Sequence, residues 1–240
     1  MASEQYKVLY EGISKMVCEA DSPERVILHF KDTTSAYNNI KKATIKGKGE
    51  ICCKISSFIF NYLNMNGLKT HFIAMQSPCD QLCTKVEIIP VEFAVRNYIA
   101  GTLARRLKME EGFKPGNLIV ELSYKNRGLG VPFISEDLAV ALDLMSYEEL
   151  SKAREIIVKA NALLTDLFAK AGIKLIDFKA FFGRTSSGEL ILANEISPET
   201  ARLWDIETEE KLDKDRFRRD MDDVAISYNK IYERLTSLEI

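Results

Sequence analysis

The chain has 240 residues, of which 46% are hydrophobic and 28% are charged, and its formal net charge at pH 7 is -2. This length and apolar fraction are enough to bury a core in one large domain or in two small lobes. The nearly neutral balance gives no global positive field for holding nucleic acid or an acidic membrane surface, so any anion site must be local.

The ends and the cysteines indicate the compartment. The N-terminal residues MASEQYKVLYEG lack a basic segment followed by an apolar one, and no apolar run reaches the roughly 18 residues of a membrane span. Cys79 and Cys83 form a C-x3-C pair, but a structural zinc site takes four Cys or His ligands, and the two histidines lie in strand-like runs. We therefore expect a cytoplasmic protein with reduced structural thiols and no membrane partner. The same scarcity of histidine argues against a Ser/His/Asp or Cys/His hydrolase.

Short apolar runs separated by turn residues fill the first part of the chain. KVLYEG, SKMVCEA and RVILHFKD are divided by Gly12 and by Asp-Ser-Pro at residues 21–23, a pattern typical of antiparallel strands. Apolar residues at helical spacing from Ile51 to Leu63 then predict a helix that ends at Gly67.

The second part alternates strand and helix signals. Strand-like runs return from THFIAM through TKVEIIPVEFAVRNYIAG, and the Gly-, Pro- and Asn-rich residues 112–132 predict a mobile connection, either a lid or a plain loop. Ser146 and Glu149 form a capping-box pattern that opens a helix continuing to Gly172. Residues 209–235 are charged with an apolar stripe and predict a terminal helix.

Charges inside apolar strand runs mark the first candidate site. IKLIDFKAFF and ELILANEI flank RTSSG and predict a hairpin, with Asp177 and Lys179 in the first run and Glu195 in the second. Asp177 and Lys179 are two residues apart, so both project from one face of their strand. Burying such charges without partners is costly, which favours a functional cleft. A hairpin with one solvent-exposed face is the alternative.

Two further segments contain groups that suit anions. VRNYIAGTLARR places Arg96, Arg105 and Arg106 around a Gly-Thr pair, and arginine forks with a hydroxyl suit a phosphate or carboxylate. A solvated basic turn is the alternative. SPETARLWD sets Arg202 beside the only tryptophan, Trp204, whereas IKGKGE lacks the spacing of a Walker motif.

In this order, these segments resemble SAICAR synthetase (phosphoribosylaminoimidazole-succinocarboxamide synthase) along nearly the whole chain. The matching stretches are LYEGISK, FKDTTSAYN, GKGE, THFI, IIPVEFAVRNYIAGTLARRL, EEG, LIDFKAFFG, NEISPETARLWD and DKDRFR. The resemblance implies a two-lobed α+β fold with a nucleotide cleft between a mostly antiparallel N-terminal nucleotide-binding lobe at residues 1–86 and a larger α/β substrate-binding lobe at residues 87–240. It also implies a homodimer or larger assembly.

The implied reaction is ATP-dependent ligation of L-aspartate to the carboxylate of carboxyaminoimidazole ribotide (CAIR), with Mg2+, in purine biosynthesis. All three substrates are anionic, so the cleft must be cationic. By position, the resemblance assigns residues to the reaction centre, to the nucleotide and to the ribotide. These are Asp177, Lys179 and Lys125 at the reaction centre; Lys15, Glu87, Ile88 and Glu92 at the nucleotide; and Arg96, Thr102, Arg202, Ser35 and Asn38 at the ribotide.

The departures from the family pattern fall mostly on the chemistry. Ile13 replaces a nucleotide-contacting lysine, and the two metal-binding carboxylates, a Glu and an Asp in the family, are Phe181 and Asn194 here. Mg2+ prefers anionic oxygens, so we expect a weakened metal site, with Glu195 or Glu199 as substitute ligands. Two functions remain open: an active ligase, or a catalytically impaired or silent relative that binds nucleotide or ribotide. A nucleic-acid-binding module does not fit the charge balance.

Overall fold

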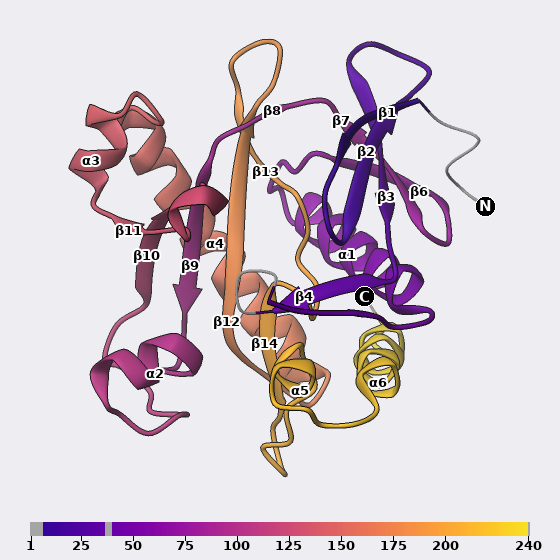
Figure 1. The fold of residues 1–240 in the computed structure, drawn as a ribbon, viewed down its shortest axis with the longest axis vertical. Helices are drawn as coiled ribbons and strands as arrows, with labels where there is room; N and C mark the ends of the chain where they lie inside the picture. The colour runs from indigo at the N-terminus through magenta and orange to yellow at the C-terminus, as the bar shows by residue number, and fades with distance from the viewer. Residues whose placement is uncertain (1–6, 37–39, 240) are drawn as a thin grey trace.

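Two antiparallel sheets and a short ribbon organise the molecule in the computed structural model, which describes residues 7–36 and 40–239 (Figure 1). The first sheet has five strands in the order β1, β2, β3, β7, β6, and each neighbouring pair is antiparallel. Its strands are β1 (Val8–Glu11), β2 (Lys15–Glu19), β3 (Arg25–Phe30), β6 (Phe72–Ser77) and β7 (Asp80–Thr84). The ribbon consists of β4 (Thr33–Ala36) and β5 (Lys41–Thr44).

The second sheet is built around one long strand, β12 (Ile173–Arg184). The seven strands follow the order β11, β10, β9, β12, β13, and β14 and β8 also pair with β12. The remaining strands are β8 (Glu87–Ile88), β9 (Val91–Arg96), β10 (Ile119–Tyr124), β11 (Phe133–Ile134), β13 (Leu190–Ala193) and β14 (Ala201–Asp205). Because β9 and β14 both pair with β12 at Asp177 and Phe178, residues far apart in the sequence lie side by side there.

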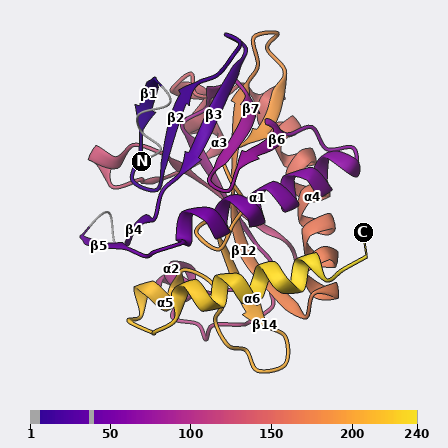
Figure 2. The same cartoon turned by 90° about the vertical axis from the view of Figure 1, so that its right-hand side faces the viewer.

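Helices cover the sheets and join them. Helix α1 (Lys48–Met65) packs on strands of the first sheet and also against α6 (Val224–Thr236), and Figure 2 shows these two helices running side by side. Helix α4 (Tyr147–Lys170) packs on β12. The shorter helices are α2 (Gly101–Leu107), α3 (Glu136–Ala141), α5 (Asp215–Arg218) and the 3-10 helix η1 (Arg127–Leu129).

The hydrophobic core runs through both sheets. A single cluster of buried residues contains Phe60 of α1, Phe93 of β9, Phe168 of α4 and Tyr228 of α6. The α+β class predicted from the sequence is confirmed, while a division into lobes at residues 86 and 87 stays a prediction. Among the helices of the described residues, none is long and apolar enough to cross a membrane.

The strongest local signals are confirmed. The apolar spacing from Ile51 to Leu63 lies inside α1, and Gly67 follows with a left-handed φ of 73°, which glycine adopts without a Cβ penalty. The Ser146 hydroxyl accepts from the Glu149 amide, and the Glu149 carboxylate accepts from the Ser146 amide, so both halves of the capping box are present.

Two predictions are wrong. Residues 112–132 are not simply a loop, because they contain β10, which pairs along its whole length with β9. The terminal helix does not begin at residue 209. Asp213 is buried and accepts from the amides of Leu203 and Asp215, which holds that segment in a turn. Helix α6 starts only after Asp223, whose φ of 63° interrupts any earlier helix.

We expect Ser146→Ala to lower the free energy of unfolding by about 1 kcal/mol, because it removes an N-cap acceptor from the longest helix. Urea denaturation followed by circular dichroism measures this change. Ser151→Ala, at an exposed interior position of the same helix, is the matched control and should stay within about 0.5 kcal/mol of the parent. Equal effects of the two substitutions would contradict a capping role for Ser146.

Candidate active site

Three adjacent strands bring two arginines onto one aspartate. Asp177 of β12 lies opposite Arg96 of β9 and opposite Arg202 of β14. The same oxygen, Asp177 Oδ2, accepts from Arg96 Nη1 at 3.0 Å and from Arg202 Nη1 at 2.7 Å. Asp177 and Arg96 are buried, so the alternative of a harmless solvent-exposed hairpin face is wrong for Asp177. We call these three residues the arginine row.

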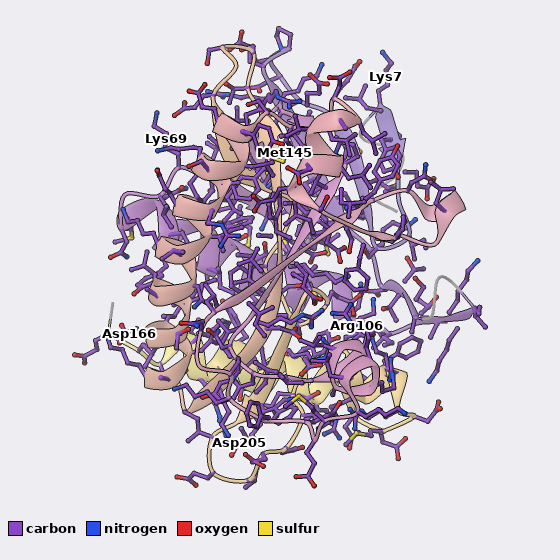
Figure 3. All side chains as sticks on the ribbon, turned by 90° about the vertical axis from the view of Figure 1, so that its left-hand side faces the viewer. Lys7, Lys69, Arg106, Met145, Asp166 and Asp205 are labelled. Carbon is purple, nitrogen blue, oxygen red and sulfur yellow. The ribbon has the colours of Figure 1, made fainter. Side chains whose placement is uncertain are left out.

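Two more carboxylates fix the outer edges of the arginine row. Glu121 of β10 accepts from Arg96 Nε at 2.8 Å and also binds Arg106, which Figure 3 labels at helix α2. Asp215 accepts from Arg202 Nε at 2.9 Å. Burial lowers the pKa of Arg202, but Asp177 and Asp215 outweigh burial and hold that pKa above its ordinary value. The Arg202 guanidinium is therefore charged, and the carboxylates hold both guanidinium groups in fixed orientations.

Gly101, at the start of α2, makes room for Arg202. Its φ is 59°, and a Cβ at this position would clash with the Arg202 guanidinium. The Gly101 amide donates to Glu111 Oε1 at 2.9 Å, and Glu111 also accepts from Arg219 at 2.7 Å. A side chain at residue 101 would therefore displace one end of the arginine row.

Lys179 is the next residue on the same face of β12. Its ammonium lies 2.7 Å from Glu92 Oε1 on β9, and its side chain is 43% exposed, so a ligand can reach it. Its amide donates to the Thr200 carbonyl at 2.9 Å. Lys179 therefore lies beside the segment that leads into Arg202.

Lys15 reaches the same segment from the first sheet. Its ammonium pairs with the buried carboxylate of Glu195, which also accepts from the Ser197 hydroxyl at 2.7 Å. Lys15 and Lys179 thus contact residues 195–202 directly, and Asp177 links Arg96 to Arg202 at the end of this segment. Sequence segments separated by up to 180 residues meet here.

Glu199 joins several distant elements in the interior. Its carboxylate accepts from Thr34 of β4 at 2.9 Å, from Lys214 at 2.8 Å and from the Tyr228 hydroxyl of α6 at 3.0 Å, and Lys48 of α1 lies 3.9 Å away. Burial raises the pKa of Glu199, but Lys214 and Lys48 outweigh it and lower that pKa to about 2. We call these five residues the Glu199 cluster.

The glycine loop before α1 is structural. The amides of Gly47 and Gly49 donate to the Asp32 carboxylate at 3.1 and 2.9 Å, and the Lys48 ammonium donates inward to the Thr33 carbonyl at 3.0 Å. These donors are therefore satisfied within the protein, which agrees with the missing Walker spacing.

Two residues assigned to the nucleotide, Glu87 and Ile88, form β8, and Glu92 lies on the following strand, β9. Glu87 and Ile88 pair with Arg184 and Gly183 at the end of β12, and both are exposed. Ile89 donates its amide to the Phe182 carbonyl at 3.0 Å. This short strand therefore presents exposed side chains beside the end of β12.

A cavity of about 620 Å3 lies where the first hairpin approaches the β4–β5 ribbon. It is lined by Glu11, Gly12, Ile13, Lys31, Thr33, Thr34, Lys42, Ala43 and Thr44. A second cavity, of about 410 Å3, borders β10 and β11 and includes Arg106 and Glu121. Among the described residues, neither lining includes Arg96, Lys179 or Arg202.

The other residues assigned to the ribotide are Thr102, Ser35 and Asn38. Thr102 is exposed on α2, and its hydroxyl accepts from Arg105 Nη2 at 3.3 Å. Ser35 is half-buried on β4 and lies opposite Lys42 of β5. Asn38 lies outside the described residues. Sequence reasoning missed Glu121, whose only signal was its charge within an apolar run.

The two positions assigned to metal ligands lack carboxylates. Phe181 is buried on β12, and the Lys125 ammonium lies 3.8 Å from the centroid of its ring. Asn194 has a left-handed φ of 74°, and its carbonyl is 3.0 Å from His71 Nε2. Burial lowers the pKa of His71 to about 4, so this imidazole is neutral at pH 7. Among the described residues, no group of three or more His, Cys, Asp or Glu side chains could hold a metal, so the side chains do not fit a carboxylate-bound Mg2+.

Comparison with known proteins finds relatives that match nearly the whole chain. A protein of Clostridium perfringens named phosphoribosylaminoimidazole-succinocarboxamide synthase is 48% identical over 231 residues, covering 96% of this chain and 98% of the relative. The crystal structure of the synthase of that name from Ehrlichia chaffeensis matches with a TM-score of 0.94 at 39% identity, covering 98% of this chain and 100% of that one. A structure described as SAICAR synthetase (Type-2) in complex with ADP matches with a TM-score of 0.92 at 42% identity, covering 96% of this chain and 98% of that one.

These matches place the chain among the carbon-nitrogen ligases of purine biosynthesis. The sequence profile described as SAICAR synthetase matches residues 8–235. The chain belongs to the SAICAR synthetase family.

Glu199 should make stability depend on pH in acid. Its folded pKa of about 2 lies below the ordinary 4.5, so the unfolded chain binds the proton more readily, and the stabilisation is present above pH 4.5 and lost as the pH falls toward 2. We expect Glu199→Gln to reduce the free energy of unfolding at pH 7, and the gap to the parent to narrow between pH 4.5 and pH 2. Urea titrations across this range measure the gap. A constant gap would contradict the ion pairing.

Proposed function

We propose that the chain is an ATP-dependent ligase that joins L-aspartate to the carboxylate of CAIR, giving SAICAR, ADP and phosphate. The arginine row carries the proposal, because two charged guanidinium groups held by Asp177 beside Lys179 suit an anionic ribotide. The family membership and the ADP complex of a 42% identical relative support a nucleotide as the second ligand.

The chemistry explains the need for cations. A carboxylate resists attack by an amine, so an oxygen of the CAIR carboxylate first attacks the γ-phosphorus of ATP and ADP leaves. The aspartate amine then attacks the acyl phosphate carbon, phosphate leaves, and the amine loses a proton as the amide forms. Negative charge accumulates at the phosphoryl group and at the acyl oxygen, where fixed donors stabilise the transition states.

The side chains divide into three groups in this proposal. Arg96 and Arg202 bind the ribotide, with Thr102, Ser35 and Asn38 around it. Lys179 and Lys125 place charge at the reaction centre, and Asp177 orients the arginines. Lys15 contacts the nucleotide phosphates, while Glu87, Ile88 and Glu92 border the base. The cavity lined by Gly12, Ile13 and Thr33 includes residues that come just before Lys15 in the chain, and it suits the phosphate groups of the nucleotide.

A second function is favoured by one observation. Phe181 fills a position where the family has a metal-binding carboxylate, and it carries the Lys125 ammonium on its ring. A chain altered there could retain ribotide and nucleotide binding while losing efficient turnover. The proposal also includes a cytoplasmic location and a homodimer or larger assembly, which light scattering of the purified chain would check.

ADP release in the presence of ATP, MgCl2, CAIR and aspartate separates the two functions. The ligase should release ADP only when both CAIR and aspartate are present. Binding of CAIR in calorimetry without ADP release would support the silent relative. In that case Phe181→Glu combined with Asn194→Asp should restore turnover if the replaced carboxylates are the sole defect, and a double variant that folds but stays inactive would refute that explanation.

Arg202→Lys should raise the KM for CAIR. The substitution keeps the charge but loses the fork between Asp177 and Asp215, and hydrogen bonds to charged groups contribute about 1.5–3 kcal/mol, which corresponds to a rise of roughly ten- to a hundredfold. Steady-state kinetics measures this, with Arg154→Lys on the exposed surface of α4 as the matched control. An unchanged KM for CAIR would remove Arg202 from the ribotide site.

A further inference from the structure

The face of β12 that bears Asp177 and Lys179 continues to Phe181. Alternate residues of a strand share a face, so these three side chains follow one another on one face of β12. Phe181 is 3% exposed, and the Lys125 ammonium lies 3.8 Å from its ring centroid. An aromatic face attracts an ammonium through its quadrupole but provides no oxygen to a divalent cation. At Phe181, the third position of this face, the side chain therefore holds the ammonium of Lys125.

The two carboxylates predicted as substitute metal ligands are already paired with lysines. Glu195 pairs with the Lys15 ammonium and accepts from Ser197, and Glu199 pairs with Lys214 and accepts from two hydroxyl groups. A divalent ion would have to displace an ammonium from either carboxylate. Neither Glu195 nor Glu199 is therefore a ready substitute for the lost ligands.

The charges at the two metal positions balance without a metal. The family pattern has a Glu and an Asp where this chain has Phe181 and Asn194, so two negative charges are missing here. Two negative charges are what one divalent cation neutralises. At these two positions, losing the carboxylates together with the ion leaves the net charge unchanged, whereas losing only the carboxylates leaves it more positive.

We propose that this chain binds its nucleotide without a protein-held divalent cation, and that the ammonium groups of Lys15 and Lys125 provide the positive charge beside the phosphates. The proposal rests on the proposed nucleotide function and concerns how that nucleotide is held. Asn194 has a left-handed backbone, which aspartate also tolerates, so the family ligands can be restored without changing the chain path.

Calorimetry of ADP binding to the full chain tests the proposal, with excess EDTA in one series and excess MgCl2 in the other. We expect the Kd for ADP to differ by less than about threefold between the series, where tenfold corresponds to about 1.4 kcal/mol. Mn2+ should also show no ADP-dependent binding to the chain in electron paramagnetic resonance beyond that of the Mn2+–ADP complex itself.

Phe181→Glu combined with Asn194→Asp should create metal dependence. ADP should then bind at least about tenfold more tightly with MgCl2 than with EDTA. Phe181→Leu is the matched control, because it removes the ring contact with Lys125 and adds no oxygen, so its binding should remain independent of Mg2+. The comparison on the parent chain alone still decides the proposal if the double variant does not fold.

The outcomes separate this proposal from the function on which it rests. ADP binding by the parent chain that tightens about tenfold or more with MgCl2 would overturn the proposal and leave the nucleotide function intact. Failure of ADP to bind in either series would overturn both. Equal binding by the parent with Mg2+-dependent binding by the double variant would support both.

Discussion

The Asp177 carboxylate holds together two arginines that would otherwise repel each other in the interior. Arg96 and Arg202 come from strands on opposite sides of β12, and both donate to the same oxygen. Buried like charges are tolerated only when opposite charges are close, and Glu121 and Asp215 supply that charge at the outer ends. The resulting alternation of charge keeps the guanidinium groups rigid, which lowers the cost of ordering them around an anion.

The rest of the fold keeps this row in position. Glu199, three residues before Arg202, is held by side chains from β4, α1, α6 and the turn before α5. The first sheet and the C-terminal helix are therefore tied to the segment that carries Arg202. Gly101 adds a steric condition from the other side, since a larger residue there would occupy the space of the guanidinium. Site and scaffold are thus stabilised by the same contacts.

Local signals allowed the elements with strong periodicity or capping to be predicted from the sequence. Helices α1 and α4 follow from apolar spacing and from Ser146 with Glu149, whereas β10 was hidden by its Gly-, Pro- and Asn-rich flanks. The turn before α5 depends on Asp213 accepting from Leu203, ten residues earlier, which no local pattern encodes. The terminal helix was therefore predicted too long.

The charges of Asp177, Lys179 and Arg96 marked candidate sites from the residues alone, but only the resemblance joined them into one site. Arg96 and Asp177 are 81 residues apart and Lys15 and Glu195 are 180 apart, and residue type alone does not pair such distant charges. The resemblance also predicted that Phe181 and Asn194 have lost the metal-binding carboxylates, but not which groups they contact instead. The structure adds that the Lys125 ammonium lies on the Phe181 ring and that the Lys15 ammonium lies on Glu195.

These two contacts indicate that the replacement of the metal-binding carboxylates is accommodated by the surrounding side chains. If the carboxylates had been lost by drift alone, nothing would require the neighbouring cations to be satisfied by other groups. Here the Lys125 and Lys15 ammonium groups both have a partner within the protein, and Phe181 is buried in the strand that also carries Asp177. Because these charges are paired and Phe181 is buried, the site has a stable alternative electrostatic arrangement. The arginine row and the metal positions can therefore change independently within one scaffold.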